Sequence, residues 1–246
     1  MGNDEHSLKV AQRAQQEGLT PMAWCDRMEA AFKERWAALD VSFDDFIRTS
    51  EERHKKGVLA LIKGVREANP DDIFLGEYKG WYCYGCEEFK LEKNLVPPTK
   101  DGLCPEHPNR KPEWLTEKNQ FFRLSKYRDA LLKHIEEHPE FVQPEARRNE
   151  VVNVLKGGLE DLSISRPVAK ALGWGIPFPG DPERVVYVWF DALTNYITGV
   201  GFGSDDALFG TWWPADLHIV GKDITRFHCI IWPAMLMAAG IALPKT

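Results

Sequence analysis

The chain has 246 residues, of which 43% are hydrophobic and 28% are charged, and its formal net charge is −6. This composition excludes bulk disorder, and the negative charge excludes a chain-wide basic surface for nucleic acid. The longest apolar stretch, residues 229–243, contains proline and glycine and is shorter than the ~20 residues of a membrane helix, so we expect no membrane contact. The five cysteines are unevenly spaced, which predicts no disulfide framework and favours a reducing, cytoplasmic compartment.

Residues 1–66 are predicted to be mainly helical, because apolar side chains recur at helical spacing. Thr20 is a predicted N-cap with Pro21 at the first helical position, and a second helix start is predicted around residues 42–45. After residue 69 the sequence changes to short β-prone runs and turn-rich segments. Further along we expect one strand and two helices, at residues 121–124, 126–137 and 145–158.

Near residue 185 the pattern changes again. Residues 185–190 form a continuous apolar run, typical of a strand buried on both faces, and a helical stretch follows at 192–198. Residues 217–220 repeat this scheme, with a short loop and a helix that begins near Thr225. Two successive strand–loop–helix units predict a parallel α/β sheet with functional residues at the carboxyl ends of its strands.

A metal site is the strongest prediction from the residues themselves. Cys83-x-x-Cys86 is followed, after seventeen residues, by Cys104-x-x-His107. Two such pairs of ligands can close a tetrahedron around Zn²⁺. Because protein fills all four positions, we expect one structural zinc ion and no open catalytic position. Cys25 and Cys229 lie outside the pattern and are predicted to be ordinary buried thiols.

Two further segments carry candidate site residues. The run from Gly221 to His228 lies at a predicted strand-to-helix turn, where free N–H groups suit an anion such as a phosphate. The run from Trp189 to Ala192, with Tyr196 four residues further on, would give an aromatic-lined pocket for a small apolar substrate. On pattern alone the alternatives are a simple turn, a satisfied core histidine and ordinary core aromatics.

These segments, with others in the same order, resemble methionyl-tRNA synthetases. The resemblance covers essentially the whole chain and rests on seven motifs: residues 2–6 (G-N-D-E-H), 43–46 (F-D-D-F), the Cys/His knuckle, 121–125 (F-F-R-L-S), 161–166 (D-L-S-I-S-R), 187–192 (Y-V-W-F-D-A), and 218–224 (H-I-V-G-K-D-I) with 227–228 and 232–234.

The resemblance implies an α/β fold: an incomplete Rossmann-like class I synthetase nucleotide fold, interrupted by a connective-peptide domain with a zinc knuckle. Its parts would be residues 1–68, without the first strand and helix, a connective domain at 69–184, and the second half of the nucleotide fold at 185–246. The implied reaction is ATP-dependent activation of methionine with Mg²⁺, followed by transfer to tRNA, whose contacts would lie mostly outside this chain.

The resemblance also implies residue roles. Asp4 would meet the amino group of methionine, and Lys222 would act near the reacting phosphate. The methionine side chain would contact Trp189, Ala192, Tyr196, Phe227 and His228. ATP would contact Gly221, Asp223 and Arg166.

The sequence departs from the family pattern in three ways. Asn3 and Ser7 replace residues of the usual G-T-D-E-H-G motif, and Leu193 stands where many relatives carry proline. The H-I-G-H and K-M-S-K-S signatures, which serve the ATP phosphates, occur nowhere in the chain. We therefore expect the chain alone to be inactive in methionine activation and in tRNA charging.

Two other hypotheses remain open. A class I synthetase for Leu, Ile, Val or Cys would share the fold, but not the motifs at 161–166 and 189–192. A non-catalytic zinc-knuckle module that binds RNA or a protein would need a basic surface. Lysines and arginines near the knuckle are offset by acidic residues, which does not favour that alternative.

Overall fold

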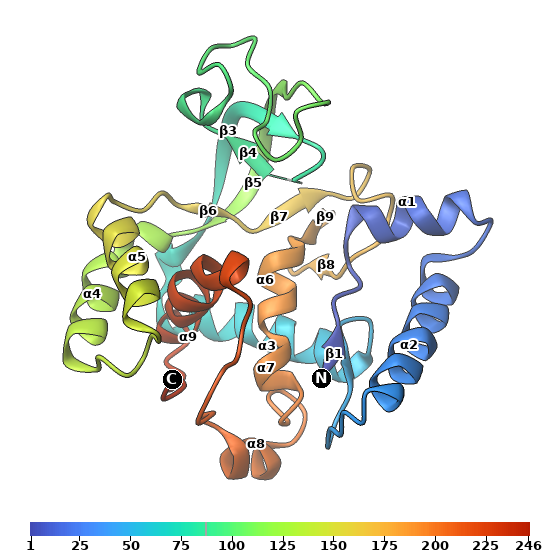
Figure 1. The fold of residues 1–246 in the computed structure, drawn as a ribbon, viewed down its shortest axis with the longest axis vertical. Coiled ribbons are helices and arrows are strands. Elements are labelled where there is room, and N and C mark those ends of the chain that lie inside the picture. The colour runs from blue at the N-terminus through green and yellow to red at the C-terminus, as the bar shows by residue number, and fades with distance from the viewer. Residues whose placement is uncertain (87) are drawn as a thin grey trace. The chain divides into compact units, whose positions relative to one another are not determined.

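The computed structural model describes residues 1–86 and 88–246. They divide into two compact units. Unit 1 comprises Met1–Phe74 and Phe121–Thr246, and unit 2 comprises Leu75–Gln120. Unit 2 is therefore an insertion in the chain of unit 1, entered along β3 (Ile73–Cys83) and left along β5 (Glu113–Phe122) (Figure 1).

The insertion in this division is shorter than the predicted connective domain at residues 69–184. Residues 121–184 group with unit 1, because strands and helices in this range pack into the core described below. The three-part domain division stays a prediction.

Three helices follow the N-terminal strand β1 (Gly2–Asn3): α1 (Leu8–Gln16), α2 (Pro21–Ala38) and α3 (Glu52–Ala68). The predicted cap of the second helix is confirmed, since the Thr20 hydroxyl accepts a hydrogen bond from the Ala23 amide at 3.2 Å, with Pro21 at the first helical position. Such a cap satisfies one of the amides that a helix leaves unpaired at its start.

The helix start predicted around residues 42–45 is wrong. The segment leads into the strand β2 (Ile47–Arg48), which pairs with β1 in parallel. Asp45 does not cap a helix there, because its carboxylate accepts from both terminal nitrogens of the Arg53 guanidinium at 2.9 Å each. This fork ties the segment to the first turn of α3.

The middle of unit 1 follows the predictions closely. The short helix η3 (Leu124–Tyr127) leads into α4 (Arg128–Glu137), and α5 (Glu145–Lys156) ends at Gly157. The strand predicted at residues 121–124 is confirmed for its first half, the end of β5.

A buried carboxylate fixes the turn before β3. Asp72, the last residue of η1 (Pro70–Asp72), is 1% exposed. It accepts hydrogen bonds from the Lys126 ammonium at 2.8 Å and from the Tyr127 hydroxyl. Because both donors come from η3, the pair joins the end of α3 to the start of α4.

Short antiparallel strands link the middle of the chain to its last third. β7 (Ser165–Pro167), β9 (Asp181–Val186) and β8 (Pro177–Phe178) form a sheet with β9 in the centre. β6 (Leu162–Ser163) pairs with the end of β5.

The strand predicted at residues 185–190 is wrong beyond Val186. The helix α6 (Val188–Leu193) begins directly after β9, and α7 (Asn195–Thr198) continues it. A continuous apolar run fits a buried helix as well as a buried strand, so the pattern could not separate them. Trp189 therefore lies on a helix and not at the end of a strand.

The strand predicted at residues 217–220 is also wrong, since these residues belong to no strand of the described structure. After α8 (Asp206–Trp212), single backbone bonds join this stretch to the chain's last residues, for example His218 N to Thr246 O at 2.9 Å. Since neither 185–190 nor 217–220 forms the predicted strand, the parallel sheet predicted from them is wrong as well. The helix expected near Thr225 does form.

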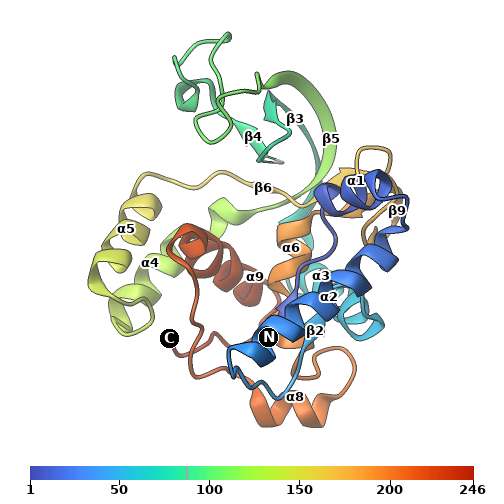
Figure 2. The same ribbon diagram turned by 45° about the vertical axis from the view of Figure 1, so that its right-hand side comes forward.

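The C-terminal helices begin with a single 3₁₀ turn, η4 (Lys222–Ile224). A π-helical turn, η5 (Phe227–Ile231), follows and runs into α9 (Trp232–Ala238). α9 and α7 both contact α3. Figure 1 labels all three helices, and Figure 2 shows α9 and α3 from a second side.

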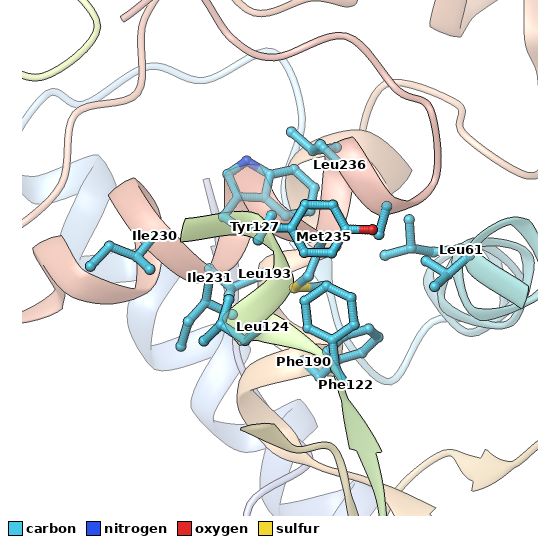
Figure 3. Close-up of a cluster of buried hydrophobic side chains, with 14 of the residues drawn as sticks. Leu61, Phe122, Leu124, Tyr127, Phe190, Leu193, Ile230, Ile231, Met235 and Leu236 are labelled. Carbon is cyan, nitrogen blue, oxygen red and sulfur yellow. The ribbon is translucent and has the colours of Figure 1, made fainter. Parts of the chain in front are cut away.

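These helices enclose the core of unit 1. Side chains from α3, β5, η3, α6, η5 and α9 meet there with almost no exposure, and Phe122 and Phe190 meet edge to face at 5.9 Å between ring centroids. Figure 3 shows this cluster: Leu61, Phe122, Leu124, Tyr127, Phe190, Leu193, Ile230, Ile231, Met235 and Leu236. The core therefore holds α6 rigidly beneath the residues of the candidate site.

Unit 2 is small and β-rich. β4 (Glu88–Lys90) pairs antiparallel with the end of β3, and the short helix η2 (Glu92–Asn94) follows. Its buried apolar side chains include Tyr82 and Leu95. Across the whole described chain, no helix is both long enough and apolar enough to cross a membrane.

Candidate functional site

The four predicted metal ligands come together in unit 2. One donor atom from each of Cys83, Cys86, Cys104 and His107 lies within 4.8 Å of all the others. The Cys86 sulfur is 3.4 Å from the Cys104 sulfur and 3.2 Å from the His107 Nδ1, which is 3.9 Å from the Cys83 sulfur. Zn–S and Zn–N bonds of ~2.3 and ~2.0 Å give tetrahedral edges of about 3.5–3.8 Å. The donor set and its spacing therefore fit one tetrahedral Zn²⁺.

Gly85 makes this approach possible. A β-carbon at this position would lie 2.5 Å from two carbons of the His107 ring. The cluster also has a neighbour that the sequence analysis missed: the Glu106 carboxylate lies 3.0 Å from the Cys104 sulfur and 3.2 Å from the Lys90 ammonium. Its place between two ligands in the sequence gave no signal for this contact.

A cavity of about 700 Å³ opens in unit 1. Five predicted substrate residues line it: Asp4, Trp189, Ala192, Tyr196 and His228. Its other lining residues come from β1 and β2 with their flanking residues, from α6, from α7 and the turn after it, and from the 3₁₀ turn η4: Met1, Gly2, Asn3, Phe43, Asp44, Asp45, Ile47, Thr49, Leu193, Asn195, Gly199, Val200 and Ile224. Segments that lie far apart in the sequence thus line one cavity.

One wall of this cavity is aromatic. The rings of Trp189 and Phe227 stack with their centroids 3.9 Å apart and their planes at 15°. Phe227 does not line the cavity itself. Phe227 stacks on Trp189, which does line the cavity, so Phe227 is connected to the site only through this contact.

The polar end of that wall is a tyrosine–histidine pair. The Tyr196 hydroxyl lies 2.7 Å from the His228 Nε2, and the His228 Nδ1 lies 2.9 Å from the Ile224 carbonyl oxygen. Because a carbonyl only accepts, Nδ1 carries the proton, and the neutral ring accepts from the tyrosine through Nε2. Burial lowers the pKa of His228 and raises the pKa of Tyr196, so both groups are neutral near pH 7.

Carboxylates gather at the opposite side of the cavity. Asp4, Asp44 and Asp45 all line it. The Arg53 fork neutralises Asp45. A cavity lined by both carboxylates and aromatic side chains suits a ligand that combines a cationic group with an apolar part.

The predicted phosphate-binding residues lie elsewhere in unit 1. Lys222 lines a second cavity of about 320 Å³, and Gly221 and Asp223 line neither cavity. The Lys222 and Asp223 side chains are 71% and 89% exposed and lie 3.8 Å apart. Since the preceding stretch is no strand and η4 is a single turn, the expected strand-to-helix anion site is not formed as predicted.

Arg166, on β7, lines neither of these two cavities. Its guanidinium donates to the Ser163 hydroxyl and to the Ser165 carbonyl oxygen at 2.8 Å each. It also lies over the ring of Tyr187, 3.9 Å from the centroid. The arginine is therefore oriented by its own strand and by an aromatic face.

Sequence reasoning missed a buried polar cluster beneath the large cavity. Asp191, the residue before Ala192, accepts hydrogen bonds from His6 and His54 at 2.7 and 2.6 Å. A carboxylate inside an apolar run was the only available signal, and its partners lie more than a hundred residues away in the sequence.

Comparison with known proteins gives a consistent result. The family model described as tRNA synthetases class I (M) matches residues 1–110 and 104–246. The methionine–tRNA ligase of Thermotoga maritima is 51% identical over 99% of this chain, and that of Thermosynechococcus vestitus is 50% identical over 99%. The chain spans only 38% and 45% of these two relatives.

Solved structures agree in fold. The Mycobacterium tuberculosis methionyl-tRNA synthetase bound by methionyl-adenylate superposes with a TM-score of 0.89 at 46% identity, covering 99% of this chain and 47% of that one. The free form of the same synthetase gives a TM-score of 0.79 over 91% of this chain and 44% of that one. The mixed α/β arrangement is thus that of a class I synthetase, and the chain belongs to the methionyl-tRNA synthetase family of class I tRNA synthetases.

Proposed function

We propose that this chain forms the methionine-binding part of a methionine–tRNA ligase and carries its zinc knuckle. The observation that supports this most is the shared cavity. It combines an acidic side that holds Asp4 with an aromatic wall built on Trp189 and Tyr196. Methionine has the matching chemistry, a cationic amino group and a flexible apolar side chain.

In the proposed complex, the Asp4 carboxylate accepts hydrogen bonds from the methionine ammonium. The side chain lies against Trp189 and Ala192 and reaches Tyr196 and His228. Phe227 keeps the indole in place by stacking. Because Tyr196 donates its only hydroxyl proton to His228, its oxygen turns lone pairs, not a proton, toward a ligand.

The nucleotide would bind next to methionine, at the segment that contains residues 221–223. Lys222 would stabilise charge on the reacting phosphate of Mg-ATP, with Gly221, Asp223 and Arg166 at the nucleotide. The methionine carboxylate would attack the α-phosphate, and methionine would then pass to tRNA, whose contacts lie mostly outside this chain. Such chemistry depends on positioning and on charge stabilisation, not on a covalent enzyme intermediate.

One Zn²⁺ would be held by Cys83, Cys86, Cys104 and His107. All four ligands are protein groups, so the ion would be structural and would keep the loops of unit 2 ordered. Thiolate ligands require a reducing compartment, and the cytoplasm provides one.

Isothermal titration of the chain with methionine, norleucine and leucine tests the proposal, with zinc quantified in the same sample. We expect methionine-selective binding and about one zinc per chain. Asp4→Asn should weaken the affinity for methionine by about tenfold to a hundredfold, which corresponds to the loss of one charge-assisted hydrogen bond.

Asp44→Asn is the matched control. It removes a carboxylate from the same cavity and should change the affinity less than threefold, or by under ~0.7 kcal/mol. Equal losses in both variants would show a general charge effect without a specific amino-group contact. An absence of methionine binding with zinc still present would contradict the proposed pocket and would favour the alternative, a non-catalytic zinc-knuckle module.

A further inference from the structure

A buried carboxylate lies between two histidines directly beneath the large cavity. On Asp191, Oδ2 is 2.7 Å from the His6 Nδ1, and Oδ1 is 2.6 Å from the His54 Nε2. The far nitrogen of His54, Nδ1, lies 2.8 Å from the Thr198 hydroxyl. The Asp191 and His54 side chains are 0% exposed and that of His6 is 2% exposed.

This relay joins the two sides of the cavity. His6 stands two residues after Asp4, on the segment that follows β1. Asp191 stands between Trp189 and Ala192 on α6. One carboxylate therefore connects the acidic side of the cavity to its aromatic wall, and α3 contributes the second imidazole.

The segment between Asp4 and His6 is anchored from the other side as well. The Glu5 amide donates to the Thr49 hydroxyl at 2.9 Å, and its carboxylate accepts from Arg48 at 2.8 Å. The Trp174 indole donates to the Glu5 carbonyl oxygen at 2.6 Å. The two residues that follow Asp4 are thus both held in place, Glu5 by these contacts and His6 by the relay.

A fully buried carboxylate persists only where hydrogen-bond donors satisfy both of its oxygens. Here each oxygen has one imidazole N–H, which favours the ionised form and lowers the pKa of Asp191 against the raising effect of its burial. Loss of the charge would leave two imidazoles facing each other across an uncharged group. The relay is thus a directional link and not a generic packing contact.

We propose that Asp191 is a positioning residue, which acts through His6 and His54 to hold Asp4 at a fixed distance from the aromatic wall of the cavity. The ligand in this statement, methionine, rests on the proposed function. The geometric link between the two segments does not depend on it. Asp191 itself is absent from the cavity lining.

The test compares Asp191→Asn with Thr194→Val. Thr194 is equally buried on the same stretch, but its hydroxyl donates to the Phe190 carbonyl oxygen of its own helix and takes no part in the relay. Hydrogen exchange should increase at residues 4–6 in Asp191→Asn and stay unchanged there in Thr194→Val. Equal exchange at these residues in both variants would overturn the proposal.

Methionine affinity provides the second readout. Asp191→Asn should weaken binding at least tenfold, and Thr194→Val less than twofold. In the Asp4→Asn background, Asp191→Asn should add less than a further twofold, because the relay acts through the carboxylate already removed. Fully additive losses would show that Asp191 supports the fold in general and would refute the positioning role.

Thr198→Val serves if Asp191→Asn does not fold, since it removes the last hydrogen bond of the relay and otherwise only a 3.4 Å bond to the Asn195 carbonyl oxygen. The same two readouts should change in the same direction, by about threefold in affinity, and no change in either would overturn the proposal. If the unmodified chain does not bind methionine, the proposed function fails. Hydrogen exchange at residues 4–6 then decides the positioning claim by itself.

Discussion

Removal of the proposed zinc ion should unfold unit 2 and leave unit 1 intact. The perturbation is chelation of the purified chain, or Cys104→Ala as its genetic equivalent. The donor atoms of the cluster lie within 4.8 Å of one another. Without a cation, three sulfurs and an imidazole would be held together by weak hydrogen bonds alone.

The magnitude follows from how little else unit 2 buries. Apart from the ligands, the buried apolar side chains among its described residues are Tyr82, Leu95 and Pro112. Burial of a side chain such as Tyr82 or Leu95 contributes roughly 1.5–3 kcal/mol. Zinc binding in small zinc modules contributes ~10–16 kcal/mol, which is more than these few side chains supply together.

Hydrogen exchange with mass spectrometry, read separately for residues 75–120 and 121–246, measures the effect. Protection should fall throughout the first range on chelation, persist in the second, and return when zinc is added. Cys229→Ala is the control, because that cysteine lies in unit 1, outside the cluster. Full protection of unit 2 in a sample shown to be free of metal would refute the reasoning.

Three further changes test the packing and electrostatics of unit 1. Gly57→Ala should lower the free energy of unfolding by about 1–3 kcal/mol in urea titrations, because its β-carbon would overlap a threonine methyl on α7. Gly64→Ala on the same helix is the control and should not lower it, because the nearest atom is 3.9 Å away. Burial lowers the pKa of His218 from 6.5 to about 4, so the unfolded chain binds a proton at a higher pH than the folded chain does. The free energy of unfolding, measured in urea titrations, should therefore fall by up to about 3 kcal/mol as the pH is lowered from 6.5 to 4. In His218→Gln this fall should be smaller. Tyr196→Phe leaves the His228 Nε2 without its hydrogen-bond partner and should lower the free energy of unfolding by about 1–3 kcal/mol in the same titrations. An unchanged unfolding midpoint would contradict a contribution of this hydrogen bond to stability.

Much of the helical framework could be predicted because local signals determine it. The Thr20 cap and the glycine that ends α5 act within one turn of chain, and both predictions are confirmed. The errors at residues 185–190 and 217–220 have another origin. Residues 185–190 are almost all buried, so their sequence shows no period that distinguishes helix from strand. In residues 217–220 the side chains of Leu217 and Ile219 are 56% and 88% exposed, so this apolar run forms no buried strand. Backbone partners far away in the chain decide the outcome, and no local pattern reports them.

The candidate site divides in the same way. Residues that contact a ligand stand in short motifs, and the structure brings Asp4, Trp189 and Tyr196 to one cavity. The relay on Asp191 has no motif of its own, since its members are distant in sequence and meet only after the helices pack.

The relation between the two proposed ligand regions shows why the structure was needed. The sequence predicted the 221–223 turn and the aromatic run at the carboxyl ends of two strands of one parallel sheet, where their side chains would lie close together. In the structure Trp189 and Lys222 line different cavities, and His228 lines both of them. Its ring is fixed by Tyr196 on one side and by the Ile224 carbonyl on the other. A neutral, doubly anchored imidazole is therefore the shared wall between the proposed methionine pocket and the cavity that holds Lys222. Any movement that brings Lys222 toward a phosphate next to bound methionine must carry this wall with it, because Ile224 belongs to the same turn as Lys222.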